Sequence, residues 1–261
     1  MKAVNEMGNR RRAALSITTA ILAFSVVSLA QYDKKPYTEW SEKEANKVLN
    51  DSPWSQTHTL VDTSKAFNTS RGRRSAASTA SSVVEVNFRV RFLSSRPVRQ
   101  ALSRLALLHD HHMPEQMLGR LKALADGPFP DYVVVAVTCD SDRGSDMLQQ
   151  ANETLRRATT AVLANKTYLI TNDGQRIYLK EYQTPRNDGF GARFIFPRII
   201  DGKEMLSSSS LTGEVVFHTE MGGGSDLNSG VTTSDTATGY GFTLHTRYKV
   251  KEMTFNGRLE Y

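Results

Sequence analysis

The sequence predicts an α+β fold, with strand and helix alternation of the α/β kind in the N-terminal part and a β-rich, mostly antiparallel C-terminal part. Apolar and polar residues alternate strictly from Val84 to Phe92, which is typical of a strand with one buried face. The nearly continuous apolar run from Asp131 to Thr138 is typical of a central strand buried on both faces. From Tyr168 to the C-terminus, strand patterns predominate.

The predicted helices are marked by their start signals. Ser41 and Glu44 have the spacing of a capping box and are followed by apolar residues on one face, which predicts a short helix. A proline near the first turn predicts helices from Ser95 to Leu108 and from Met113 to Ala125. A long helix is expected from Ser145 to Ala164.

The C-terminal part contains a strong hairpin signal. Asn172-Asp173-Gly174 separates two strand-like segments, Tyr168 to Thr171 and Arg176 to Tyr182, and is typical of a tight turn between paired strands. The same reading predicts further strands at residues 192–196, 214–219, 242–250 and 253–261. These signals indicate an antiparallel arrangement.

The sequence divides into four parts. Residues 1–30 form a predicted signal peptide, and residues 31–62 form a short helix and strand segment. Residues 63–82 contain one aromatic residue and no aliphatic residue larger than alanine, so we expect a flexible linker that cannot bury enough apolar surface to order itself. Residues 83–261 form the mixed α and β body with its β-rich C-terminal part.

The N-terminus has the features of a cleavable export signal. Lys2 and Arg10-Arg11-Arg12 form a basic start, Ala13 to Val27 is apolar, and Ser28-Leu29-Ala30 supplies small residues where a signal peptidase reads. We therefore expect a periplasmic or secreted protein. An uncleaved membrane anchor is the alternative, because Ala13 to Ala30 is at the lower edge of what spans a bilayer.

Charge and cysteine content restrict the possible partners and compartment. The chain has 33 basic and 27 acidic residues, of which residues 1–30 hold four and one, so the mature chain has 29 and 26 and a net charge of +3. The excess is scattered, so we expect no nucleic-acid partner. We expect the protein to contact the membrane only transiently, through the signal peptide. The expected partner is an unidentified envelope or extracellular one.

Cys139 is the single cysteine, which excludes an internal disulfide.

The densest group of metal-capable side chains is His109-Asp110-His111-His112, at the junction of two predicted helices. A turn of this kind can present imidazoles to Zn or Ni. However, His109, His111 and His112 lack the i, i+4 helical spacing of a metal site, and histidine and aspartate also favour helix ends through capping. They are candidate metal ligands with a structural alternative.

The segment from Cys139 to Asp142 directly follows the most apolar strand. Ligand-binding groups often occupy this place in α/β sheets, so Cys139 is a candidate nucleophile and Asp140 and Asp142 are candidate carboxylates. Alternatively, the two aspartates form a turn and Cys139 fills the sheet as a small apolar residue. No phosphate loop or complete calcium loop is present in the sequence, so we expect no cofactor.

Several segments are distinctive when taken together: Lys35-Pro36-Tyr37 leading to Trp40 and Glu44-Ala45, Asp51 to Trp54, Ser95 to Ala101, Phe194 to Arg198, and Lys251 to Tyr261. They resemble a family of uncharacterised, signal-peptide-bearing exported proteins of soil bacteria of the acidobacterial type. The resemblance implies export and a single folded unit. It implies no catalytic or binding residue.

The expected function is that of an exported, non-enzymatic binding or envelope-associated module. The alternative is a secreted hydrolase or metal-binding protein that uses Cys139 to Asp142 or His109 to His112. The sequence itself contains no complete catalytic motif that decides between them.

We predict that the mature protein begins at Gln31, because Ser28 and Ala30 provide the small side chains that signal peptidase requires. Mass spectrometry of protein recovered from the cell envelope checks this. Peptides that contain Met1 in mature, membrane-extracted material would instead establish the anchored form.

Overall fold

The computed structural model describes residues 35–62, 84–110, 112–129, 131–206, 212–222, 231–236 and 239–261. The predicted signal peptide and the predicted linker of residues 63–82 lie outside these ranges. The chain divides into two units, residues 1–41 and 42–261. In the first, a 3-10 helix η1 (Tyr37–Glu39) is followed by Trp40, whose indole N–H donates to the carbonyl of Lys35 at 3.0 Å.

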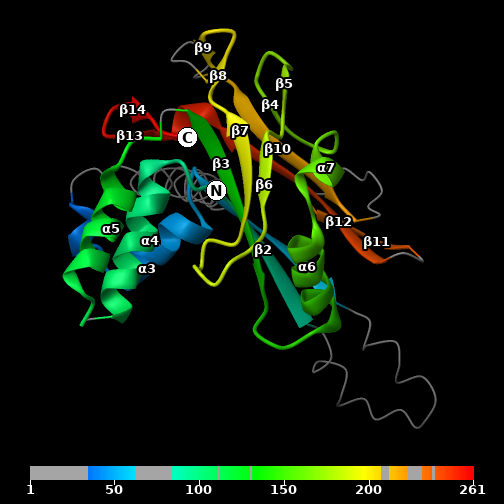
Figure 1. Cartoon of the computed structure of the whole chain (residues 1–261), viewed down its shortest axis with the longest axis horizontal. Helices are drawn as coiled ribbons and strands as arrows, with labels where there is room; N and C mark the ends of the chain where they lie inside the picture. Colours follow the sequence, from blue (N-terminus) through cyan, green and yellow to red (C-terminus); the bar gives the residue numbers. More distant parts are fainter. Residues whose placement is uncertain are drawn as a thin grey trace, which may run out of the picture. The chain divides into compact units, whose positions relative to one another are not determined.

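The second unit contains two five-stranded sheets, and every strand pairing among its described residues is antiparallel (Figure 1). Sheet A has the order β1 (Ser55–Asp62), β2 (Val84–Phe92), β3 (Tyr132–Asp140), β7 (Ala192–Pro197) and β6 (Glu181–Gln183). Sheet B has the order β11 (Val231–Thr236), β12 (Gly239–Lys249), β10 (Glu214–Met221), β4 (Thr167–Ile170) and β5 (Arg176–Tyr178).

The fold is α+β, as the sequence predicts. Two short hairpins complete it: β8 (Ile199–Ile200) with β9 (Lys203–Glu204), and β13 (Thr254–Phe255) with β14 (Arg258–Leu259). The predicted segment at residues 31–62 contributes β1 to the same sheet as the body, because β1 pairs with β2 along its whole length. The N-terminal alternation of strands and helices produces no parallel pair, since β2 and β3 are antiparallel neighbours.

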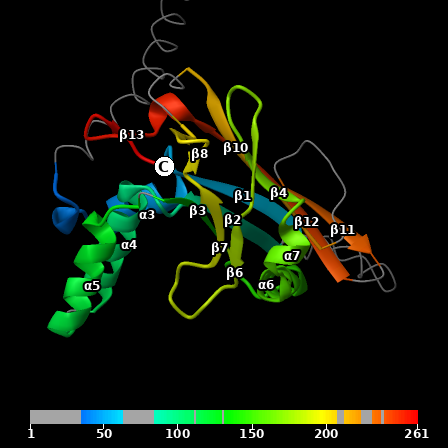
Figure 2. The same cartoon turned by 45° about the horizontal axis from the view of Figure 1, so that its top comes forward.

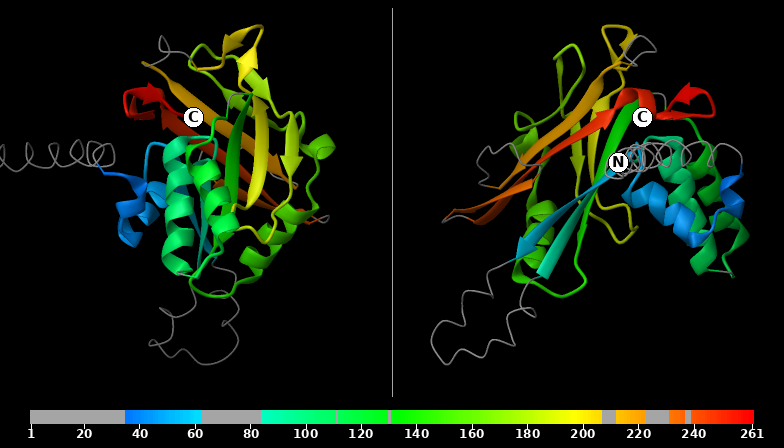
Figure 3. Two further views of the ribbon diagram at one scale, coloured as in Figure 1. Left: turned by 60° about the vertical axis from the view of Figure 1, so that its left-hand side comes forward. Right: turned by 180° about the vertical axis from the view of Figure 1, so that it is seen from behind.

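The helices form two groups (Figures 1 and 2). In the first, α3 packs against β1 and α4, and α4 packs against α5; in the second, α6 contacts β3 and β12, and α7 contacts β6 and β10. Figure 3 shows α4 and α5 beside β3 in its left-hand view. Their bounds are α3 (Glu42–Asn50), α4 (Arg96–His109), α5 (Glu115–Asp126), α6 (Asp146–Arg157) and α7 (Thr160–Leu163).

Three predicted elements differ from those observed. The single strand expected from Arg176 to Tyr182 is two strands, β5 and β6, because the Leu179 N–H donates to the Thr167 carbonyl of sheet B and the Lys180 N–H donates to the Ile195 carbonyl of sheet A. The long helix expected from Ser145 to Ala164 breaks after Arg157, because Ala158 and Thr159 are extended and the Thr159 hydroxyl accepts from the Val162 N–H at 3.4 Å, which starts α7. The single strand expected at residues 253–261 is the β13–β14 hairpin, because Asn256 (φ 50°) and Gly257 (φ 72°) both adopt the positive φ of a tight turn.

The core lies between the inner faces of the two sheets. Phe88 of β2 contacts Phe242 of β12 with ring centroids 4.8 Å apart, and Phe194 of β7 contacts Phe217 of β10 at 5.2 Å. Each of these four rings is fully buried. The alternating apolar residues of β2 therefore face sheet B, as the sequence pattern indicates.

Replacing Phe217 by alanine is expected to lower the free energy of unfolding by about 3–5 kcal/mol, because the ring fills the space between β7 and β10 and leaves a cavity when removed. Tyr178→Ala is the matched control, since that ring is 48% exposed and should cost less than about 1 kcal/mol. Chemical denaturation measures both. Equal losses would show that Phe217 is not a core residue.

Candidate functional site

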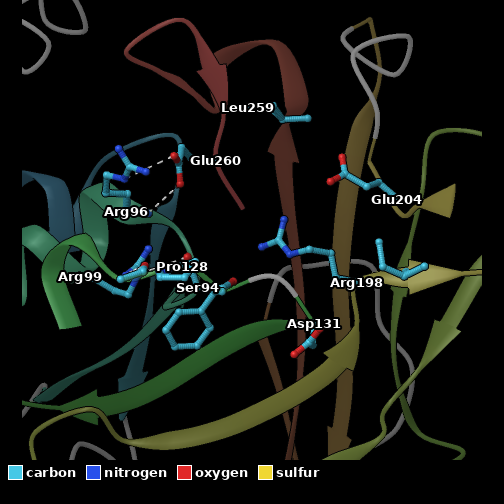
Figure 4. Close-up of a pocket in the computed structure, with 12 residues that line it drawn as sticks. Ser94, Arg96, Arg99, Pro128, Asp131, Arg198, Glu204, Leu259 and Glu260 are labelled. Atoms are coloured by element: carbon cyan, nitrogen blue, oxygen red, sulfur yellow. Dashed lines mark hydrogen bonds and ion pairs between the residues drawn. The ribbon is translucent and has the colours of Figure 1, made fainter. Parts of the chain in front are cut away.

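A pocket of about 480 Å³ lies at the end of sheet A where β3 begins and β7 ends (Figure 4). This volume is in the range of small-molecule sites. The wall is built from segments that are distant in sequence: the start of α4, the turn after α5, the first residue before β3, the β8–β9 hairpin and the C-terminal hairpin. The lining includes Arg96, Arg99, Asp131, Arg198, Glu204 and Glu260.

Arg99 fixes one wall of the pocket. Its Nη1 donates to the carbonyls of Leu124 and Gly127, both at 2.6 Å, and its Nε donates to the Ser94 carbonyl at 3.3 Å. The two Nη1 bonds supply partners to the carbonyls of Leu124 and Gly127, at and after the C-terminus of α5, where a helix leaves its last carbonyls unpaired. Arg99 therefore positions the loop that contains Phe129, over whose ring the guanidinium lies at 4.9 Å.

Glu260 closes the pocket beside α4. Its carboxylate accepts from the backbone N–H of Arg96 at 3.1 Å and lies 3.7 Å from Arg96 Nε (Figure 4). The hydroxyl of Ser95 does not cap the helix but donates to the Phe92 carbonyl at 2.7 Å. Glu260 thus supplies the negative charge that a helix N-terminus favours. Its own carbonyl accepts from the indole of Trp54 at 2.8 Å, which holds the C-terminal segment in place.

Arg198 reaches the pocket from the strand β7 side (Figure 4). Its guanidinium lies 4.1 Å over the ring of Tyr261 and donates through Nη2 to the Tyr261 carbonyl. The Tyr261 hydroxyl in turn donates to the Leu206 carbonyl at 2.9 Å. Arg198 is therefore held by the last residue of the chain, while its Nε is buried and has no hydrogen-bond partner among the described residues.

The three arginines are close enough to influence one another. Burial lowers the pKa of Arg99, the carboxylate of Glu260 raises it, and the positive charges of Arg96 and Arg198 lower it further. The Nε of Arg96, like that of Arg198, is buried without a hydrogen-bond partner in the described part of the chain. A buried polar group without a partner costs free energy.

The candidate metal ligands His109 and His112 form no metal site with other described residues. The ring Nδ1 of His109 donates to the Leu105 carbonyl at 2.7 Å, and the backbone N–H of His112 donates to the Asp110 carboxylate at 3.0 Å. His111 lies outside the described residues. Within the described ranges, no group of three or more histidine, cysteine, aspartate or glutamate side chains is arranged to hold a metal ion. His109 therefore bonds within the last turn of α4, and Asp110 bonds to the backbone just after it.

Cys139, Asp140 and Asp142 lie at and after the end of β3 but do not meet. The thiol of Cys139 donates to Asn152 Oδ1 of α6 at 3.3 Å, whereas Asp140 forms an ion pair with Arg89. Neighbouring strand residues point to opposite faces of a sheet, so the thiol and the Asp140 carboxylate are separated by the sheet itself. Asp142 is exposed after the strand. Because β3 is antiparallel to both its neighbours, the comparison with parallel α/β sheets does not apply.

The pocket residues were not singled out as a site by the sequence. Arg96, Arg198 and Glu260 belong to the distinctive segments Ser95 to Ala101, Phe194 to Arg198 and Lys251 to Tyr261, but those segments are far apart in the chain. The sequence indicates only that each arginine lies beside the end of a predicted strand or helix. Without knowledge of the long-range pairing, nothing in it indicates that the three side chains converge.

Comparison of the chain with protein-family models, with curated proteins and with solved structures gives no match. Among the helices that the structure describes, none is long and apolar enough to cross a membrane.

Cys139 should react slowly with a thiol reagent in native protein and rapidly in denaturant, because burial raises the pKa of its thiol to about 12, although Arg156 lowers it. The folded chain keeps the proton at pH values where the unfolded chain loses it. The free energy of unfolding should therefore fall as the pH rises above the ordinary thiol pKa, and Cys139→Ala should remove this fall.

The same substitution should cost about 1 kcal/mol at neutral pH, the usual scale of a point substitution. Thiol labelling with and without denaturant, and denaturation curves between pH 7 and about pH 10, provide the measurements. Fast labelling of the native protein at neutral pH would contradict the burial of the thiol.

Proposed function

We propose that the protein is an exported, non-enzymatic binding module whose pocket at the end of sheet A takes a small molecule with a carboxylate or phosphate group. The observation that carries this proposal is the convergence of Arg96, Arg99 and Arg198 on a pocket of about 480 Å³. Guanidinium groups bind planar anionic groups through paired, charge-assisted hydrogen bonds.

The rest of the lining supports a ligand larger than a bare ion. Phe129, Ile199 and Leu259 add apolar surface, and the carboxylates of Asp131 and Glu204 lie at the same pocket. Small-molecule sites combine apolar surface with polar groups that fix the orientation of the ligand, and this lining has seven polar or charged residues beside its apolar ones. The ligand class we infer therefore has an anionic end for the arginines and an organic body for the apolar wall.

The lining favours binding over catalysis. Ser94 carries the only hydroxyl among the described residues that line the pocket, and its Oγ accepts from the Val134 N–H at 3.1 Å, so it is occupied by the backbone of β3. The alternative, a secreted hydrolase at Cys139 to Asp142, has less support because the thiol pKa is raised and the carboxylate of Asp140 is paired with Arg89. Export through residues 1–30 would place the pocket in the periplasm or outside the cell.

The proposal is tested with a panel of small carboxylates and organic phosphates, screened by thermal shift and followed by calorimetry. Members of at least one class should raise the melting temperature, because a ligand that binds only the folded state stabilises it. Arg198→Gln and Arg96→Gln should each weaken the affinity tenfold or more, since a charge-assisted hydrogen bond contributes about 1.5–3 kcal/mol.

Arg120→Gln is the matched control, because Arg120 is exposed on α5 and outside the pocket lining. It should leave the affinity unchanged. The melting temperature of each variant without ligand reports its folding. If neither class binds, or if Arg120→Gln weakens binding as much as Arg198→Gln, the pocket is not an anion site.

A further inference from the structure

A second group of polar side chains lies on sheet B and is not part of the pocket. His218 of β10 and His245 of β12 are direct partners in the antiparallel register, so their side chains stand on the same face of the sheet. Their Nδ1 atoms are 3.4 Å apart. The next residue in this cross-strand row, Tyr168 of β4, stacks on the His218 ring with a centroid distance of 4.7 Å and an interplanar angle of 24°.

Glu220 sets the orientation of the His218 ring. Its Oε1 lies 3.4 Å from His218 Nε2, on the side of the ring opposite to the His245 contact. A carboxylate at this place favours a proton on Nε2, which leaves the lone pair of Nδ1 directed at His245. Metal-binding histidines commonly have this second partner, which fixes the tautomer and raises the basicity of the ligating nitrogen. The His218 side chain is also largely buried, which restricts its rotation.

The spacing of the two imidazoles matches that of metal ligands. Zinc binds histidine nitrogen at about 2.0–2.1 Å, and two corners of a tetrahedron of that size are about 3.4 Å apart. We propose that His218 and His245 bind a divalent transition-metal ion through their Nδ1 atoms, with Glu220 as the group that orients His218. Imidazole suits Zn²⁺, Ni²⁺ and Cu²⁺, and Cu²⁺ binds most tightly of the three.

The site has two protein ligands, so the remaining metal positions are open to water or to another ligand. In the described part of the chain no third histidine, cysteine, aspartate or glutamate completes it. Binding should therefore be weaker than that of a structural zinc site with four protein ligands. This inference is independent of the anion pocket, because none of its residues lines that pocket.

The test uses the full mature chain without a histidine tag, titrated with ZnCl₂ by calorimetry and with one equivalent of CuCl₂ by electron paramagnetic resonance. We expect one metal ion per chain and a copper spectrum with two imidazole nitrogens. His245→Ala should weaken Zn²⁺ binding at least tenfold and remove one nitrogen from the spectrum. Glu220→Gln should weaken it about tenfold, the scale of lost outer-shell partners.

The double variant His109→Ala, His112→Ala is the control, because it removes two exposed imidazoles at and after the end of α4, one more than His245→Ala removes from the proposed site. It should retain binding. We choose His245→Ala because His245 is only half-buried, whereas a change at the buried His218 risks impaired folding. The melting temperature of His245→Ala without metal checks that this variant folds. Absence of a stoichiometric ion, unchanged binding in His245→Ala, or loss in the double variant would overturn the proposal, because a hydrogen bond between the rings would then account for their spacing.

Discussion

The packing of aromatic rings between the two antiparallel sheets is the constraint on which the rest of the unit depends. Besides the phenylalanine contacts, Phe92 of β2 meets Tyr248 of β12 edge to face at 4.8 Å, and the Tyr248 hydroxyl donates to the Val90 carbonyl at 2.9 Å. The apolar rings supply burial, and the hydroxyl provides one directional bond across the layer. Where these rings end, α6 continues the inner layer, because it contacts β3 and β12 and bonds to Cys139 and Tyr182 of sheet A.

Arg91 links the outer face of sheet A to α3. It projects from β2 on the side opposite to Phe88 and donates to the carbonyl of Leu49 at 2.6 Å and to the side chain of Asn50 at 3.2 Å. Burial, together with the neighbouring positive charge of Arg89, lowers the pKa of Arg91 to about 10, but the side chain stays protonated at neutral pH. The C-terminus of α3 is thus fixed by a cation, as the helix dipole favours.

The sequence predicted local elements well and long-range relations poorly. The alternation from Val84 to Phe92 and the turn at Asn172-Asp173-Gly174 predicted β2 and the β4–β5 hairpin, because both signals depend on near neighbours. Apart from this hairpin, the partners of the strands did not follow from the sequence. The pairing of β3 with β7 crosses about 60 residues, and no local pattern records it.

The candidate site was unpredictable for the same reason. The pocket needs Glu260 beside Arg96 and Tyr261 beside Arg198, and each of these pairs joins segments that are more than 60 residues apart. Burial of a charged side chain is also a property of the fold rather than of the sequence. Cys139 is a partial exception, since its place at the end of an apolar strand predicted a small buried residue, and the structure shows a half-buried thiol that donates to Asn152.

Four arginines near sheet A illustrate how partners separate structural side chains from candidate ligand-binding ones. Arg91 and Arg99 are 8% and 2% exposed, and both donate to backbone carbonyls at helix ends, so their removal would leave those carbonyls without partners. Arg96 and Arg198 line the pocket, where Arg96 pairs with Glu260 through its Nε and Arg198 lies over the ring of Tyr261. The first pair fixes helix ends, since Arg91 holds the end of α3 and Arg99 holds the end of α5. The second pair is held by the C-terminal segment instead, which leaves its positive charges beside the space that a ligand would occupy.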